Sequence, residues 1–255
     1  IEGIVQNWIS LEIAGNSGGI RFYIRAPKDK KNLVESAFFS QYPNVEITEV
    51  EDYTKSFPRS LPNEKYDIFG TDLILGRESA YPIRTYPDFE AIFEFEEKNV
   101  DPIAVLTESI SHLKGNETAW IQVLIRPAGS DWIKDAQNVA DELSGKKQKA
   151  KKRSIGAGLE EFVRNLISAP LQVPEWAEQA PKEVSESKTT ATEQEAIKAI
   201  QRKMSKRAYE TIIRFIYIDD KDKFTGDNVS ALFGSFQMFA SQNINFFRPN
   251  SNTLT

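Results

Sequence analysis

The chain has 255 residues, of which 40% are apolar and 27% charged, the ordinary balance of a soluble protein with one large domain or two smaller ones. Its net charge of -5 excludes a surface that is basic as a whole, and the absence of cysteine excludes disulfides, thiolate metal sites and cysteine nucleophiles. No apolar run approaches the roughly 18 residues that cross a bilayer. Because the chain begins at Ile1 without methionine, we expect it to be a piece of a longer protein.

The first elements follow from the alternation of apolar and polar residues. This alternation predicts strands over 8–14 and 20–25, joined into a hairpin by a glycine-rich turn. After Pro27, an apolar stripe at helical spacing predicts a helix over 28–41. Two further strands are predicted over 45–50 and 66–75, and Gly70 predicts a bulge or kink in the second of them.

A second group of elements reads as helix, strand, helix. Asp101 is a favoured N-cap and Pro102 suits the first helical position, so the sequence predicts a helix over 102–113. An apolar strand is predicted over 119–126, and an amphipathic helix over 131–143.

The composition changes over 145–192, which has the character of a linker with a short helix over 155–167. Beyond it, Thr192 and Glu195 form a capping-box pattern, three residues apart, at the start of a predicted helix over 193–205. The remaining predictions are a strand over 208–218, a helix over 228–240 and an edge strand over 243–249.

These elements predict an α+β fold with mixed sheets, helices packed on one face, and ferredoxin-like β-α-β units in two lobes. The expected boundaries are an N-terminal lobe over 1–144, a linker over 145–192 and a C-terminal lobe over 193–255.

The polar residues favour structural roles over catalysis. Most carboxylates of the first strands alternate with apolar residues, so a solvated sheet face is favoured over an acid–base pair or an acidic recognition surface; they are Glu12, Glu46, Glu49, Glu51 and Asp52. A later set lacks the closing glutamate of a calcium loop and is interpreted as cap and turn residues: Asp219, Asp220, Asp222 and Asp227. His112, the single histidine, is expected at the surface of a helix end. We therefore expect no catalytic residue, no metal ligand and no cofactor.

Two features favour binding to partners. A basic run can neutralise phosphates of nucleic acid or anionic lipid, the alternative being a solvated flexible segment; its members are Lys146, Lys147, Lys149, Lys151, Lys152 and Arg153. Neighbouring Phe38 and Phe39 cannot both face inward on one helix, and 89–97 mixes apolar with acidic residues. We expect Phe39, Phe93 and Phe95 to belong to a partner surface.

Several stretches have a distinctive amino-acid sequence, and they occur in this order: ISLEIA…GIRFYIRAP…VESAFFSQYPNVEITEVEDY, YPIRTYPDFE, DPIAVLTESISHLKGNETAWIQVLIRP and KMSKRAYETIIRFIYI. Together they span about 9–245, and this region resembles the part ahead of the motor domain in bacterial proteins related to type IV secretion DNA-transfer ATPases. The resemblance implies a domain next to, or partnered with, a P-loop ATPase. Because the chain contains no Gly-x-x-x-x-Gly-Lys-Ser/Thr, no residue here inherits ATP hydrolysis.

The expected function is a non-catalytic scaffold domain of such a DNA-transfer motor. The expected partners are a P-loop ATPase domain or other secretion subunits, together with DNA, an anionic membrane surface or a second copy of the chain. The expected location is the cytoplasm, at the inner face of the cytoplasmic membrane through the rest of the parent protein. Two alternatives stay open: a nucleic-acid- or membrane-binding module acting through 146–153, and a metal-dependent enzyme built on carboxylates.

Overall fold

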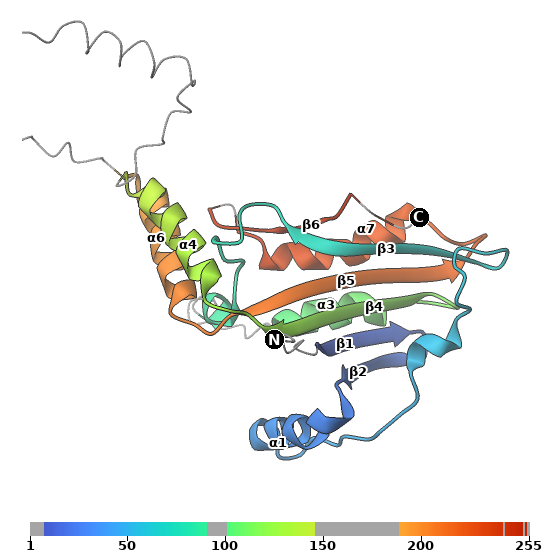
Figure 1. The fold of residues 1–255 in the computed structure, drawn as a ribbon. Helices are drawn as coiled ribbons and strands as arrows, with labels where there is room; N and C mark the ends of the chain where they lie inside the picture. Colours follow the sequence, from blue (N-terminus) through green and yellow to red (C-terminus); the bar gives the residue numbers. More distant parts are fainter. Residues whose placement is uncertain (1–7, 91–100, 146–188, 242, 252, 254–255) are drawn as a thin grey trace, which may run out of the picture.

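A six-stranded antiparallel sheet forms the centre of the molecule (Figure 1), in the order β2-β1-β4-β5-β3-β6. The computed structural model describes residues 8–90, 101–145, 189–241, 243–251 and 253. The strands are β1 (Ile9–Asn16), β2 (Gly19–Arg25), β3 (Tyr66–Leu75), β4 (Thr118–Pro127), β5 (Tyr209–Asp220) and β6 (Phe247–Pro249).

Helices cover one face of this sheet. They are α3 (Pro102–Ser111), α7 (Gly226–Gly234) and the 3-10 helix η3 (Ser235–Phe239), which lie behind the strands in Figure 1. Leu106 and Ile110 of α3 and Leu232 of α7 pack into one core with Ile121 and Phe215 of the sheet. The predicted α+β class, with helices packed on one face, is confirmed.

Local capping chemistry explains where the helices begin. Asp101 accepts a hydrogen bond from the backbone N–H of Ile103 at 2.8 Å, and Pro102 occupies the first turn of α3, as predicted. Helix α6 (Ala191–Met204) begins two residues before its predicted start. The capping box forms between Thr190 and Glu193, which have the same three-residue spacing as the expected Thr192 and Glu195.

Helices α4 (Asp131–Leu143) and α6 pack against each other in an arm that extends from one end of the sheet (Figure 1). Their contact is made of small and branched side chains: Ala136, Ala140, Ala196 and Ile200. The arm is joined to the rest of the molecule through Tyr81 and its neighbour Ala80.

The sheet corrects the expected division into lobes. Strand β5 belongs to the expected C-terminal lobe, 193–255, yet it pairs on one side with β4 and on the other with β3, both from 1–144. The two expected lobes therefore share one sheet, and its described strands pair antiparallel throughout instead of forming mixed sheets with parallel β-α-β units.

Two local predictions are also corrected. Residues 45–50 form no strand: they pair with none of the strands in the described part of the chain, and Val50 is exposed. Gly70 lies in a continuous register, opposite Ile216, without a bulge.

Candidate functional site

Among the described residues, a short aromatic segment covers one end of the face of the sheet opposite α3 and α7. Tyr53, in the 3-10 helix η2 (Tyr53–Ser56), and Phe57 pack edge-on against Trp120 of β4, with ring centroids 5.3 and 5.7 Å apart. Tyr53 also stacks on Tyr23 of β2 at 4.6 Å. The segment therefore covers this end of the face, and a pocket lies toward the other end.

A row of polar side chains crosses the sheet beside this aromatic segment. The strand register places Glu12, Gln122, Arg214 and Asp72 next to one another on β1, β4, β5 and β3. Adjacent strands lie about 4.8 Å apart, so each side chain reaches its neighbour. Arg214 Nε donates to Asp72 Oδ1 at 3.1 Å, and Gln122 Nε2 donates to Glu12 Oε2 at 3.1 Å.

Glu12 is held in place by two neutral partners. Its Oε2 accepts from Gln122 and from the hydroxyl of Tyr53, and Gln122 also donates to that hydroxyl at 2.9 Å. Burial, together with the hydrogen bond to Glu12, raises the pKa of Tyr53 well above its ordinary value, so the phenol stays protonated and donates at neutral pH. Glu12 itself is 7% exposed, which corrects its expected place on a solvated face.

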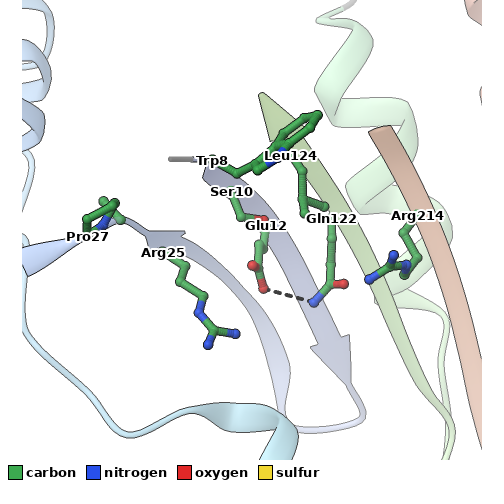
Figure 2. A pocket seen from close by; sticks show the side chains of 9 residues that line it. Trp8, Ser10, Glu12, Arg25, Pro27, Gln122, Leu124 and Arg214 are labelled. Atoms are coloured by element: carbon green, nitrogen blue, oxygen red, sulfur yellow. Dashed lines mark hydrogen bonds between the residues drawn. The ribbon is translucent and has the colours of Figure 1, made fainter. Parts of the chain in front are cut away.

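Next to this row lies a pocket of about 400 Å³ (Figure 2). Its lining residues come from β1, β2, β4, β5 and the segments flanking β1 and β2: Trp8, Ser10, Glu12, Arg25, Ala26, Pro27, Gln122, Leu124 and Arg214. Trp8 and Leu124 form an apolar end, where the guanidinium of Arg126 lies 4.8 Å from the Trp8 ring centroid. The hydroxyl of Ser10 is buried and has no hydrogen-bond partner among the described residues.

A second exposed feature is helix α1 (Lys31–Gln41), which follows the edge strand β2 and stands away from the sheet in Figure 1. None of its residues is buried by the described part of the chain, although it carries Leu33, Val34, Phe38 and Phe39. Leu33 is 64% exposed and Phe39 46% exposed, and Tyr42, directly after the helix, is 62% exposed. The structure thus leaves Phe39 exposed on an unpacked helix.

A third feature is a cluster of hydrogen-bonded polar side chains beneath α7. The hydroxyl of Tyr217 donates to Glu117 Oε1 at 2.8 Å, and Asn228 Nδ2 donates to the same oxygen at 2.7 Å. Asp219, 2% exposed, lies beside them, with its Oδ2 3.4 Å from the Tyr217 hydroxyl. Burial raises the pKa of Asp219.

The remaining predicted polar residues lie mostly at the surface. His112 is exposed at the end of α3, 3.3 Å from Glu108, as predicted. Asp220 accepts from Asn116 and Lys223 in a turn, and Asp227 lies in the first turn of α7, as predicted. The same prediction was wrong for Asp219, which is buried within β5.

The acidic residues predicted on a strand over 45–50 do not belong to the sheet. Glu46, Glu49 and Glu51 are exposed on an irregular segment, and Glu49 pairs with Lys31 at 3.2 Å. Asp52 caps η2 through the backbone N–H of Thr54.

Some predicted features lie outside the described residues. These are the basic run 146–153, the helix over 155–167, and Phe93 and Phe95. Within the described part of the chain, no group of three or more His, Cys, Asp or Glu residues is placed to hold a metal ion. No helix in the same part is long and apolar enough to cross a membrane.

The polar row was not predicted from the sequence, although the sequence contains a signal for it. Gln122 and Arg214 are single polar residues inside the apolar strands AWIQVLIR and TIIRFIYI. A polar side chain in the middle of such a strand needs a partner on the same face. One partner of Gln122 is Tyr53, which belongs to the short 3-10 helix η2, and the sequence of η2 shows no strand or helix periodicity.

The fold and the pocket together define an α+β domain whose antiparallel sheet is covered by helices on one side. The chain belongs to the family described as a domain of unknown function (DUF8128), whose model matches residues 5–250. No curated protein and no solved structure matches the chain.

Proposed function

We propose that this chain is a non-catalytic assembly domain that positions another subunit of a DNA-transfer machine of the type IV secretion kind. The observation that carries the proposal is helix α1, which presents Leu33 and Phe39 to solvent and has no residue buried by the described part of the chain.

The unpacked state of α1 is physically informative. A helix of this length is marginal in water by itself, and most helices in proteins are stabilised by packing an apolar face. α1 carries the apolar side chains for such a face, but they meet too little of the described chain to be buried. Transfer of a leucine or phenylalanine side chain from water to an interface contributes about 1.5–3 kcal/mol, so a partner that covers α1 gains binding energy.

The resemblance to DNA-transfer ATPases supports a P-loop ATPase domain as this partner, and supports a place at the inner face of the cytoplasmic membrane. In this arrangement the chain supplies a rigid sheet, and α1 at its β2 edge supplies the contact.

The test is the double variant Leu33→Asp with Phe39→Asp. Binding to the purified P-loop ATPase of the same DNA-transfer system is measured by isothermal titration calorimetry. We expect binding to weaken at least tenfold, because two charges then occupy the apolar surface of α1. The free energy of unfolding should change by less than about 0.5 kcal/mol, because both side chains are exposed in the folded chain.

The matched control is Asn32→Asp with Ser36→Asp, which adds the same two charges at exposed polar positions of the same helix. We expect this control to bind the ATPase within a factor of about three of the original chain. Equal binding by the Leu33/Phe39 variant would rule out α1 as the contact, and absence of binding by the original chain would rule out the proposed partner.

A further inference from the structure

The pocket on the face of the sheet opposite α3 and α7 contains two hydrogen-bonding groups that the described part of the chain does not satisfy. Ser10 is 5% exposed, and its hydroxyl oxygen is the one fully buried side-chain nitrogen or oxygen atom without a hydrogen-bond partner in the described part of the chain. A buried hydroxyl left without a partner costs about 1–3 kcal/mol, so such an atom is uncommon unless a ligand or water completes it.

The second group is the carboxylate of Glu12, which follows Ser10 on the same face of β1 because alternate residues of a strand point the same way. Both hydrogen bonds to Glu12 reach Oε2 and come from neutral groups, whereas Oε1 has no partner among the described residues. Buried carboxylates are usually paired with a cation. Arg214 does not provide that cation here, since it forms its ion pair with Asp72 at 3.1 Å and none with Glu12.

A second cation lies on the other side of Ser10: Arg25, whose guanidinium forms an ion pair with Asp52 but makes no side-chain hydrogen bond to the described residues. In the register of the sheet, Arg25 is directly opposite Ser10 on β2, and Leu124 is directly opposite it on β4. The side chain of Arg25 is 79% exposed, and its only described charged neighbour is Asp52, at 3.8 Å. A guanidinium group with free N–H donors is suited to bind a carboxylate through two parallel hydrogen bonds.

Three different chemistries therefore line the pocket with Ser10: an acceptor for a cation at Glu12, a donor for an anion at Arg25, and an apolar wall at Leu124 and Trp8 (Figure 2). Residues directly opposite one another on adjacent strands have Cβ atoms about 4.5–5.5 Å apart, so one small molecule can touch all three. The cavity of about 400 Å³ falls within the range of about 300–1,000 Å³ that holds small ligands.

We infer that this pocket binds a small zwitterion, a free α-amino acid with an apolar side chain. Its ammonium group donates to Glu12 Oε1 and Ser10 Oγ, its carboxylate accepts from Arg25, and its side chain lies against Leu124 and Trp8. An ammonium group has three donors and no acceptor, which matches the two unsatisfied acceptors of the pocket. This inference is independent of the proposed assembly function, because the pocket contains no residue of α1.

The experiment titrates the whole chain by isothermal calorimetry with L-leucine, L-methionine and L-phenylalanine in separate runs up to about 10 mM. We expect saturable binding of at least one of them, with a dissociation constant of about 1 mM or lower. Two analogues of the bound amino acid then test its charges: the N-acetyl form lacks the ammonium, and the amide lacks the carboxylate. Each should bind at least tenfold more weakly.

Variants identify the site. Glu12→Gln and Arg25→Gln should each weaken binding at least tenfold. The matched controls Glu46→Gln and Arg21→Gln change exposed residues of the same types, and Arg21 lies on the same strand and face as Arg25; both should bind like the original chain.

The analogue series uses the original chain, so it remains decisive even where Glu12→Gln disturbs folding. No saturable binding by any of the three amino acids would overturn the inference. Equal binding of either analogue, which would indicate a peptide terminus, or unchanged binding by a folded Glu12→Gln variant would also overturn it.

Discussion

At the scale of single residues, Asp219 is where the fold most clearly affects a titration. It lies buried beside Tyr217, and burial raises its pKa above the ordinary value of 3.8. Between the unfolded and folded pKa values, the folded state holds more protons than the unfolded chain. The free energy of unfolding contributed by Asp219 therefore falls as the pH rises through that window, and it is largest below it.

We predict that Asp219→Asn removes this dependence. Asparagine keeps the side-chain oxygen that accepts from the backbone N–H of residue 220 at 2.7 Å, but it does not ionise. In urea titrations between pH 3 and pH 7, the original chain should lose stability relative to the variant as the pH rises. The exposed neighbour supplies the control, since Asp222→Asn should follow the original chain at every pH. A constant difference between Asp219→Asn and the original chain would contradict the prediction.

The candidate site shows why the face that a residue occupies was easier to predict than its burial. Alternation correctly placed Glu12 on the face of β1 opposite the helix-covered core, but it predicted solvent there. The cover is supplied by Tyr53, 41 positions away in the sequence, from a segment with no strand or helix pattern. Periodicity reports which face a residue occupies, and it contains no information about which irregular segment covers that face.

At the scale of elements, the two capping-box patterns at the start of α6 can be separated by experiment. We predict that Thr190→Ala destabilises the chain by about 1 kcal/mol, because Thr190 accepts from the backbone N–H of Glu193 and its own N–H donates to the Glu193 carboxylate. Thr192→Ala should change stability by less than about 0.5 kcal/mol, since Thr192 is an exposed first-turn residue and alanine favours helix. Urea unfolding measures both, and a larger loss for Thr192→Ala would favour the predicted cap over the observed one.

Helices with a cap signal and a continuous apolar stripe were predictable from sequence. Helix α4 has the predicted bounds, 131–143, and α3 begins at the predicted Pro102. The predicted strand over 45–50 was wrong because alternation describes a half-buried strand only when another strand is available to pair with it. The prediction of a helix over 28–41 was largely correct, but the apolar stripe of this helix did not predict that α1 has no buried residue in the described part of the chain.

At the scale of the whole molecule, β5 holds the two ends of the chain in one sheet. We predict that a protease site engineered within 146–188 can be cut without separating the pieces, because β5 pairs along most of its length with both β4 and β3. After cleavage the pieces should elute together in size-exclusion chromatography and unfold in a single transition. Two independent lobes would instead give separate peaks in native buffer, which is the outcome that would contradict this prediction.

The strand order was not predictable from local pattern. The pairing of β4 with β5 joins residues far apart in the sequence, such as Ile121 and Phe215. Several strand orders are compatible with the same succession of helices and strands along the chain. The alternation of apolar and polar residues in a strand does not indicate which strands pair with it. The long 145–192 segment was interpreted as a boundary between lobes, whereas it connects two helices of one arm.

The arm formed by α4 and α6 has a consequence for how the family can vary in length. The last turn of α4 and the first turn of α6 lie side by side at its far end (Figure 1), so the two ends of the segment that joins them are held close together. In polymer terms, the cost of closing a flexible loop between two fixed neighbouring points rises only by about 0.6 kcal/mol for each doubling of its length. The arm therefore provides an insertion point at which relatives can gain or lose sequence while the register of all six strands is preserved.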